Sequence, residues 1–370
     1  MKVLHVITGL GVGGAELQLR SILQHTRHTS DVVTLYNPGA VADMIRADGG
    51  RVYDLGMRSN TELSALLRLR KLISDGWYDV VHTHLYRSCV YGRLAARLAG
   101  TPVVLSTEHS IGETHLERRR MTAGVRALYL GTERLSQATI AVSDAVRDRL
   151  VNWGVPAGKL TVIPNGLDFD RVAFGAEARS RVRAEFGIPQ GSYVLGVLGR
   201  LDANKRFDLV IEAAAPLLGE DAKLLVVGNG AERERLESVA RGTGAAEHVI
   251  FAGERHDVAA MFSALDLFIA SSAQETFGLS VLEALANGMP ALYTTCPALD
   301  GVVTDRARQV AGDAPGMRGA IAAEMAGGRR ERVGVPAIRE LYGIEAVTDR
   351  IDGLYERLRS GSQRGSVRTG

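Results

Sequence analysis

Two glutamates in the second half of the sequence stand where a carboxylate could bind the hydroxyl groups of a ligand. Glu275 follows the apolar run LFIASS in a loop, and Glu283 lies in a predicted helix that begins near Phe277-Gly278-Leu279. A carboxylate among apolar neighbours is costly unless it meets polar partners, so Glu283 is a good candidate ligand for ribose hydroxyls. The N-terminus of that helix would present unpaired N–H groups to a phosphate or sugar oxygen. A solvated face remains the alternative for both carboxylates.

Two cations lie on one loop after a predicted strand. The segment GRLDANKR places Arg200 and Lys205 five residues apart, near the carboxyl end of the sheet, where ligands of open α/β sheets bind. Arginine supplies a planar fork and lysine a point charge, so the two together can clamp a diphosphate. A further glycine turn, VVGNG with Gly228, follows another strand. It serves either as a simple turn or as a place where the backbone approaches the ligand.

A glycine-rich turn follows the first strand. The segment GLGVGG satisfies GxGxxG, which taken alone suggests a dinucleotide-binding turn. A nicotinamide site also needs an acidic residue at the end of the second strand, but the strand in SDVVTLYNPG ends in Tyr36 and Asn37. This disfavours an NAD-dependent oxidoreductase. Gly13 and Gly14, at a helix N-terminus, remain candidates for contact with a phosphate or sugar, beside the alternative of a tight turn that binds nothing.

The elements that must position these residues alternate along the 370-residue chain. Short β-branched runs are followed by amphipathic helical stretches, a pattern typical of parallel sheets covered by helices on both faces. Each half opens with a buried strand that runs into a glycine turn, which predicts two Rossmann-like domains. We expect these domains at residues 1–175 and 176–345. A helix over 346–358, packing back toward the N-terminal domain, and a disordered tail over 359–370 should follow.

Composition excludes several classes of protein. Hydrophobic residues make up 46% and charged residues 23%, which is ordinary for a globular protein. The net charge of +2 argues against a nucleic-acid partner. Cys89 and Cys296 form no CxxC pair, which argues for a reducing compartment and against a cysteine-based zinc site. Charged residues interrupt every apolar segment, so no bilayer-spanning segment is expected. We expect a cytoplasmic protein, with peripheral attachment to the inner face of the membrane left open.

Two further patterns could bind a metal. His82 and His84 share one side of a strand, and His109 could approach from a neighbouring strand, so a three-histidine site is conceivable. Hydrogen bonding or acceptor contact is the better supported role. Asp168 and Asp170 imitate an Asp-x-Asp metal motif, but they follow PNG in a turn context. We therefore expect a turn there, no essential metal, and no cofactor besides the substrate.

Several of these segments together carry a family resemblance. The pair Glu275/Glu283 within ETFGLSVLEALANGMP, the segments GGAE, VVHTH, AVSDAVRDRL and VIPNGLD, and GR followed by Lys205 occur in the family's order. They resemble retaining nucleotide-sugar glycosyltransferases of family 4, which have the GT-B fold. The resemblance implies two Rossmann-like, doubly wound α/β domains facing a central cleft. It also implies a donor bound mainly by the C-terminal domain, an acceptor bound mainly by the N-terminal domain, and catalysis without a metal.

The resemblance also implies residue roles. The first glutamate would contact the donor sugar, the second would hold the ribose, the two cations would hold the diphosphate, and His109 in STEHS would contact the sugar. The expected catalytic residues are Glu275, His109, Arg200 and Lys205. The expected donor-binding residues are Gly13, Gly14, Arg200, Lys205, Gly228, Phe277, Gly278, Leu279 and Glu283. The sequence departs from the family at TTCPALDGV, so no role is transferred beyond Cys296.

The expected activity is transfer of a hexose-type sugar from a nucleoside diphosphate, UDP first and GDP-mannose second, to an acceptor hydroxyl. The acceptor is a glycan, a lipid-linked molecule or a small molecule. A GT-B nucleotide-sugar epimerase, an oxidoreductase and a catalytically silent binding protein are the alternatives. Basic clusters in the N-terminal half are either a solvated face or a contact with an anionic membrane or a phosphorylated acceptor. These cations are Arg68, Arg70, Lys71, Arg118, Arg119 and Arg120.

Overall fold

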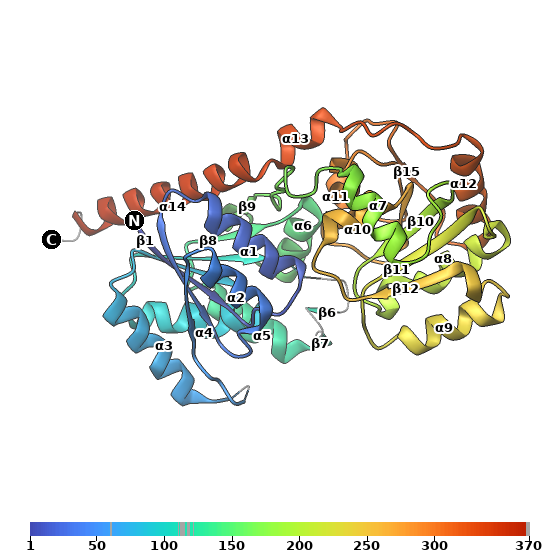
Figure 1. Cartoon of the computed structure of the whole chain (residues 1–370). Helices are drawn as coiled ribbons and strands as arrows, with labels where there is room; N and C mark the ends of the chain where they lie inside the picture. Colours follow the sequence, from blue (N-terminus) through green and yellow to red (C-terminus); the bar gives the residue numbers. More distant parts are fainter. Residues whose placement is uncertain (60, 110, 112–114, 117–118, 121, 368–370) are drawn as a thin grey trace. The chain divides into compact units, whose positions relative to one another are not determined.

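The computed structural model describes residues 1–59, 61–109, 111, 115–116, 119–120 and 122–367. The chain forms two compact units (Figure 1). The N-terminal unit comprises Met1–Gly166 and the segment from Ile344 onward, and the C-terminal unit comprises Leu167–Gly343. The chain therefore passes from one unit to the other twice. The first passage lies a few residues before the expected boundary near residue 175.

The N-terminal unit contains, within the described residues, a seven-stranded parallel sheet in the order β3-β2-β1-β4-β5-β8-β9. The strands are β1 (Lys2–Ile7), β2 (Thr29–Thr34), β3 (Arg51–Asp54), β4 (Val80–His84), β5 (Val103–Glu108), β8 (Ala138–Ala141) and β9 (Leu160–Val162). The helices are α1 (Gly14–His25), α2 (Gly39–Ala47), α3 (Leu63–Gly76), α4 (Tyr86–Leu98), α5 (Ala123–Glu133), α6 (Asp144–Trp153) and α14 (Ile344–Val367). A small antiparallel pair, β6 (His115–Leu116) and β7 (Arg119–Arg120), precedes α5.

Both faces of this sheet are buried, which explains its continuous apolar strands. One face packs Leu4 and Val81 against helices α3 and α4. The other face packs Val3 and Val80 against α14, which contributes Ile351 among others. Figure 1 shows α14 running alongside α1. The helix continues to Val367, through most of the segment 359–370 for which we expected disorder, and residues 368–370 lie outside the described residues.

The C-terminal unit contains, within the described residues, a six-stranded parallel sheet in the order β12-β11-β10-β13-β14-β15. The strands are β10 (Tyr193–Leu198), β11 (Ala222–Val227), β12 (Val249–Gly253), β13 (Leu267–Ala270), β14 (Ala291–Tyr293) and β15 (Ala307–Gln309). The helices are α7 (Ala176–Glu185), α8 (Phe207–Ala214), α9 (Arg233–Gly242), α10 (Val258–Ala264), α11 (Leu279–Ala286), α12 (Ala314–Ala326) and α13 (Pro336–Tyr342). The main core of the unit lies where α8, α9 and α12 cover the sheet.

The strand order identifies where each sheet can bind a ligand. In both units the order reverses beside the first strand, between β1 and β4 and between β10 and β13. Ligands of doubly wound sheets bind outside the carboxyl ends of the strands at that switch point. The parallel α/β architecture predicted from the sequence is confirmed.

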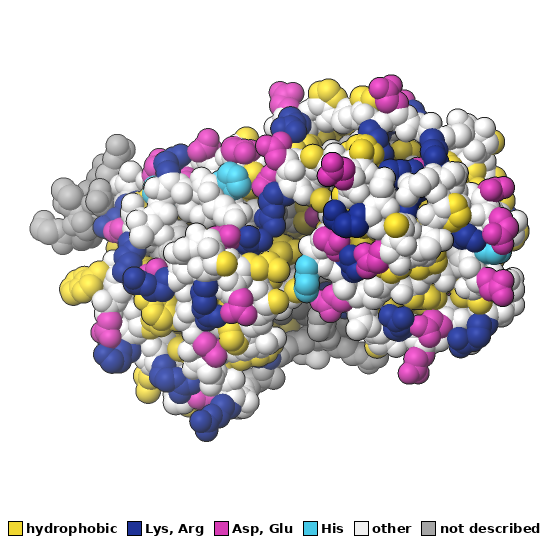
Figure 2. Space-filling view, in the orientation of Figure 1, with side chains coloured by type: hydrophobic (Ala, Val, Ile, Leu, Met, Phe, Trp, Pro, Cys, Tyr) yellow, Lys and Arg dark blue, Asp and Glu magenta, His cyan; other side chains and the backbone are white. Residues whose placement is uncertain are grey.

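The surface carries charges of both signs. On the face drawn in Figure 2, Lys and Arg side chains are interspersed with Asp and Glu side chains. This distribution agrees with the small net charge and lacks the single-sign stripe that a nucleic-acid groove presents. Among the described residues, every helix is too short or too polar to cross a bilayer.

Candidate active site

An ion pair lies at the switch point of the C-terminal sheet. Lys205 ends the short 3-10 helix Ala203–Lys205 after β10, and Glu275 lies in the loop after β13. Lys205 Nζ is 2.6 Å from Glu275 Oε1. The two side chains are 23% and 18% exposed, so the pair is sheltered but open to a ligand. The structure thus brings together a residue predicted to hold a diphosphate and one predicted to hold a sugar.

Hydrogen bonds between the two loops fix this pair. Asn204 Nδ2 donates to the carbonyl of Gln274 over 2.9 Å, and the N–H of Gln274 donates back to Asn204 Oδ1 over 3.1 Å. Ser271 Oγ donates to the carbonyl of Lys205 over 2.6 Å. Asp202 Oδ1 accepts from the N–H groups of Asn204 and Lys205, which caps the short helix. The backbones that carry Lys205 and Glu275 are therefore joined directly.

Arg200 lies on the same loop as Lys205. Its guanidinium is 3.8 Å from Asp202 Oδ2, and its side chain is 48% exposed. A contact of that length at an exposed site contributes little, because solvent screens it. Arg200 is therefore available to bind an anion at the edge where Lys205 lies.

Glu283 lies within helix α11 and is partly buried. Burial raises the pKa of its carboxyl to about 7, and the Arg171 guanidinium opposes that shift. A ligand that donates hydrogen bonds to the carboxyl favours its charged form and lowers the pKa again. Its apolar helix neighbours are buried, as the sequence predicted.

Helix α11 begins after a turn that only glycine can make. Gly278 has φ of 99°, and a Cβ there would collide with Cys296 Sγ. The buried Phe277 ring meets Tyr342 edge-on, with centroids 5.4 Å apart. The segment TTCPALDGV, where the sequence differs from the family pattern, therefore packs through Cys296 against the turn that precedes Leu279.

The glycine at position 228 has a packing explanation. Gly228 has φ of 136°, and a Cβ there would collide with the carbonyl oxygen of Gly199. The turns after β10 and β11 are thus in contact through their backbones. A ligand contact at Gly228 stays a prediction, because loop packing alone already requires glycine.

The glycine turn of the N-terminal unit begins helix α1. Gly13 is the N-cap and Gly14 is the first helical residue. A Cβ on Gly13 would collide with the Glu16 carboxylate, so the positive end of α1 already faces an anion of the protein itself. Within the described residues, a Cβ on Gly14 would meet no atom within 4 Å. Donor contact at Gly13 and Gly14 stays a prediction.

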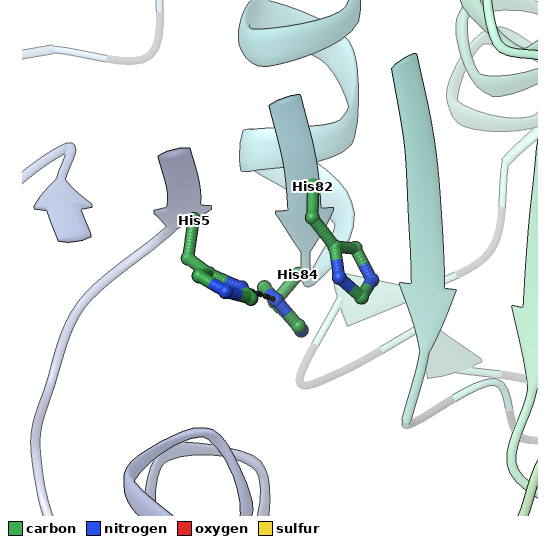
Figure 3. A group of neighbouring side chains, drawn as sticks. All are labelled: His5, His82 and His84. Atoms are coloured by element: carbon green, nitrogen blue, oxygen red, sulfur yellow. Dashed lines mark hydrogen bonds between the residues drawn. The ribbon is translucent and has the colours of Figure 1, made fainter. Parts of the chain in front are cut away.

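Histidines gather at the switch point of the N-terminal sheet. His82 and His84 lie on β4, and His5 lies on β1 in register with His82, so all three share one face (Figure 3). His84 Nδ1 is 3.2 Å from Nε2 of His109, which follows β5. Burial lowers the pKa of His109 to about 4, and a hydrogen bond with Asn165 opposes that shift. His82, His84 and His109 were predicted to lie together, whereas His5 was not, although the run KVLHVIT places it in a buried strand.

The histidine spacing alone would allow a metal ion. The donor atoms of His5, His82 and His84 all lie within 4.8 Å of one another. However, His82 bonds Tyr355 Oη and Thr107 Oγ1, each over 2.7 Å, through its two ring nitrogens. An ion would have to break these buried hydrogen bonds, so the donor set fits hydrogen bonding better than coordination.

The Asp-x-Asp segment forms a turn. Asp168 Oδ1 accepts from the N–H groups of Asp170 and Arg171, both over 3.1 Å. The Asp170 side chain is 95% exposed and lies 3.8 Å from Arg339. The two carboxylates therefore play different local roles and do not form a shared ligand set.

Comparison with known families decides the relationship. A model described as Glycosyltransferase Family 4 matches residues 12–171, and one described as Glycosyl transferases group 1 matches residues 178–326. The chain belongs to glycosyltransferase family 4. The resemblance drawn from the sequence motifs is thereby confirmed.

Relatives of this family 4 chain are named for different donors. It is 27% identical over 239 residues to UDP-Gal:alpha-D-GlcNAc-diphosphoundecaprenol alpha-1,3-galactosyltransferase of Escherichia coli. That match covers 63% of this chain and 62% of the relative, so the chain spans about three fifths of that relative's length. It is 29% identical to a GDP-mannose-dependent alpha-mannosyltransferase of Mycobacterium tuberculosis, covering 76% of this chain and 75% of the relative.

A solved structure shows the fold of the family 4 chain. Anabaena Alr3699/HepE in complex with UDP-glucose superposes with a TM-score of 0.85 at 20% identity, covering 96% of this chain and 100% of that one. With the two doubly wound sheets, this likeness confirms the GT-B fold.

The predicted basic clusters of the family 4 chain are only partly described. Arg68 pairs with Glu62 over 2.9 Å and Lys71 with Asp75 over 2.7 Å. Arg70 Nε donates to the carbonyl of Leu98 over 3.2 Å. Arg118 and the side chains of Arg119 and Arg120 lie outside the described residues.

Proposed function

We propose that the chain is a retaining glycosyltransferase that moves a hexose-type sugar from a UDP-sugar to an acceptor hydroxyl. The observation that carries this proposal is the Lys205–Glu275 pair at the switch point of the C-terminal sheet. It supplies a cation for a diphosphate and a carboxylate for sugar hydroxyls at one place. Membership of family 4 supports the same conclusion.

The departing diphosphate sets the main catalytic demand. When the bond to the anomeric carbon breaks, negative charge grows on the phosphate and the sugar becomes oxocarbenium-like. Fixed cations stabilise that charge without reorganising at the moment of reaction. Lys205 Nζ has three donors and gives one to Glu275, so the others can reach phosphate oxygens. Arg200 and the N-terminus of α11 at Phe277, Gly278 and Leu279 add to that field.

The glutamates divide the remaining contacts. Glu275, held beside Lys205, would accept hydrogen bonds from the donor sugar and keep its anomeric carbon next to the phosphate. Glu283 would accept from the two ribose hydroxyls. His109 would contact the donor sugar, a role that the resemblance to family 4 supports. No protein group acts as a general base in this scheme, and the departing phosphate is left to take the acceptor proton.

The identity of the donor base is supported by names of relatives. UDP-sugars appear in the names of the Escherichia coli relative and of the HepE complex, and GDP-mannose appears in that of the Mycobacterium tuberculosis relative. UDP is therefore our first choice, with GDP-mannose as the competing donor. The Escherichia coli relative is named for a diphosphoundecaprenol acceptor, which favours a lipid-linked acceptor over a soluble glycan or small molecule.

Helix α3 supports peripheral contact with a membrane. Leu63, Leu67 and Trp77 are 76%, 61% and 88% exposed along or just after this helix. The cations Arg68 and Lys71 lie on the same helix. Exposed aromatic and aliphatic side chains beside cations suit the interface of an anionic bilayer. Sedimentation with vesicles of anionic lipid tests this contact, and loss of binding in Trp77→Ser is expected.

A screen of nucleoside-diphosphate sugars tests the function. Thermal unfolding is recorded with UDP-, GDP- and ADP-sugars, and release of the nucleoside diphosphate is measured without acceptor. We expect UDP-sugars to raise the unfolding temperature and one of them to be hydrolysed slowly. Stabilisation by NADH alone would contradict the proposal, and conversion of the donor to another nucleotide sugar without acceptor would assign an epimerase instead.

A further inference from the structure

Three histidines of the N-terminal unit are joined in a row. His5 Nδ1 lies 3.0 Å from His84 Nε2, and His84 Nδ1 lies 3.2 Å from His109 Nε2. Figure 3 shows the first of these links, between β1 and β4. His84 therefore uses both of its ring nitrogens on other imidazoles. We call His5, His84 and His109 the imidazole row.

The rings of the imidazole row are buried and uncharged. His5, His84 and His109 are 1%, 0% and 6% exposed. Burial lowers the pKa of His5 to about 3 and that of His109 to about 4, and it keeps the pKa of His84 well below its usual value. A neutral imidazole carries one proton, so one nitrogen donates and the other accepts. At neutral pH each link therefore joins one N–H to one lone pair.

This requirement couples the three tautomers. If His109 carries its proton on Nε2, that N–H donates to Nδ1 of His84, so His84 carries its own proton on Nε2. The Nε2–H of His84 then donates to Nδ1 of His5, so His5 also carries its proton on Nε2. If His5 carries its proton on Nδ1, all three rings are Nδ1-protonated. Any mixed arrangement leaves two N–H groups or two lone pairs facing each other in a buried site.

We propose that His5 and His84 are positioning residues that fix, through the imidazole row, which ring nitrogen of His109 carries the proton. The tautomer of a functional histidine is set by the hydrogen bond of its other nitrogen. Here Nε2 of His109 is engaged by His84. The Asn165 amide, which also bonds His109, can donate or accept and so fits either tautomer, which leaves the state of the row to decide whether Nδ1 donates or accepts. The inference rests on the proposed function, in which His109 contacts the donor sugar.

His82 provides a matched control. It is fully buried, lies in register with His5, and lies against His84 with ring centroids 4.1 Å apart and ring planes tilted by 35°. Its nitrogens bond Tyr355 and Thr107 and take no part in the imidazole row. Replacing His82 therefore disturbs the same cluster without removing a link of the row.

Nitrogen-15 NMR of the full-length protein labelled at histidine tests the proposal, because Nδ1 and Nε2 shifts report the tautomer of each ring. In the wild type at pH 7.5, His5, His84 and His109 should share one tautomer. In His5→Phe the His109 signals should move toward a mixture of tautomers, whereas His82→Phe should leave them in place. A His109 tautomer opposite to that of His84 in the wild type would overturn the proposal, and this result needs no variant to fold.

Sugar transfer separates the inference from the proposed function. His5→Phe should lower kcat roughly tenfold with little change in donor KM. At metal sites, removing the hydrogen-bond partner of a functional histidine lowers activity or metal affinity about 10- to 100-fold, and tenfold is the lower end of that range. Shared tautomers with unchanged transfer would support the imidazole row and contradict the role given to His109. An unmoved His109 signal in His5→Phe, or an equal shift in His82→Phe, would contradict the row itself.

Discussion

The two units share a strand order but place opposite polar chemistry where that order reverses. Along β1 and β4 the N-terminal unit carries His5, His82 and His84, which are buried and neutral. At the ends of β10 and β13 the C-terminal unit carries the Lys205–Glu275 ion pair, which is partly exposed. Neutral buried rings can hold hydrogen bonds but cannot offset a diphosphate charge. The strand order of a Rossmann-like sheet therefore fixes where a ligand can bind, whereas the charge and solvent exposure of the side chains at that place decide which ligand binds.

Removing the cation of the C-terminal switch point should have the largest effect. Lys205→Ala is expected to lower sugar transfer on the order of a hundredfold, because a fixed cation no longer stabilises the leaving diphosphate. Steady-state kinetics measure this loss. Lys223→Ala is the matched control, since Lys223 lies in the same sheet, on β11, and its amine lies 2.9 Å from His248 Nδ1. Equal rates in the two variants would remove Lys205 from the mechanism.

The same kinetics test the absence of a metal. EDTA should leave the wild-type rate unchanged. If EDTA abolishes activity and Mg²⁺ or Mn²⁺ restores it, a metal neutralises the diphosphate. Asp168, Asp170 and the His82/His84 pair would then have to be reconsidered as ligands.

Acid should weaken the N-terminal unit through its buried histidines. The pKa of His5 falls from 6.5 in the unfolded chain to about 3 in the folded one, so the unfolded state binds protons first as pH drops. The stability that the neutral ring contributes is complete above pH 6.5 and is lost as pH falls toward 3. At pH 5 the loss is on the order of 2 kcal/mol per buried ring. Glu283 acts in the opposite sense, since its pKa is raised to about 7 and its contribution is lost as pH rises.

Tryptophan fluorescence can read this acid effect selectively. Both tryptophans, Trp77 and Trp153, belong to the N-terminal unit, and Trp153 is buried. Urea unfolding at pH 7.5 and pH 5 should show a smaller drop in stability for His5→Phe than for the wild type. His256→Phe, at an exposed position of the C-terminal unit, is the control. An identical pH dependence in all three proteins would contradict the burial argument.

The two glutamates should separate binding from turnover. Glu283→Gln is expected to weaken donor binding about tenfold, and Glu275→Gln to lower turnover by a similar factor, since a hydrogen bond to a charged group contributes about 1.5 to 3 kcal/mol. Calorimetric titration with UDP and single-turnover kinetics measure the two quantities. If both variants lose only affinity, Glu275 does not touch the reacting sugar.

Donor binding should also depend on pH through Glu283. Its carboxyl, with a pKa near 7 in the free protein, must lose its proton to accept both ribose hydroxyls. Affinity for UDP should therefore be about fourfold weaker at pH 6.5 than at pH 8. Glu283→Gln should remove that dependence. A pH-independent affinity in the wild type would mean that Glu283 does not hold the ribose.

Much of the fold and part of the candidate site follow from the sequence. The alternation of β-branched runs with helical stretches predicts both sheets, and GRLDANKR and SSAQETFG predict which loops lie at the edge of the C-terminal sheet. The ion pair between Lys205 and Glu275 was not foreseen, because the loops are seventy residues apart and are joined by hydrogen bonds that the sequence does not show, among them the reciprocal bonds of Asn204 and Gln274.

The remaining misses have the same physical origin. His5 reads as one polar residue in a buried strand, and its partners appear only when β1 pairs with β4 in parallel register. The reason for glycine at 278 is a side chain, Cys296, that arrives from a segment with no family signature. Periodicity in a sequence reports burial within one element, whereas both of these features depend on contacts between elements.

Hydrogen exchange of the full-length protein with and without UDP tests most directly that the charged switch point is the donor site. Slower exchange is expected in residues 199–206, after β10, and in residues 271–283, which comprise the loop after β13 and the start of α11. That protection should be lost in Lys205→Ala at the same UDP concentration. Protection confined to residues 8–14 and 84–86, at the switch point of the N-terminal sheet, would contradict it.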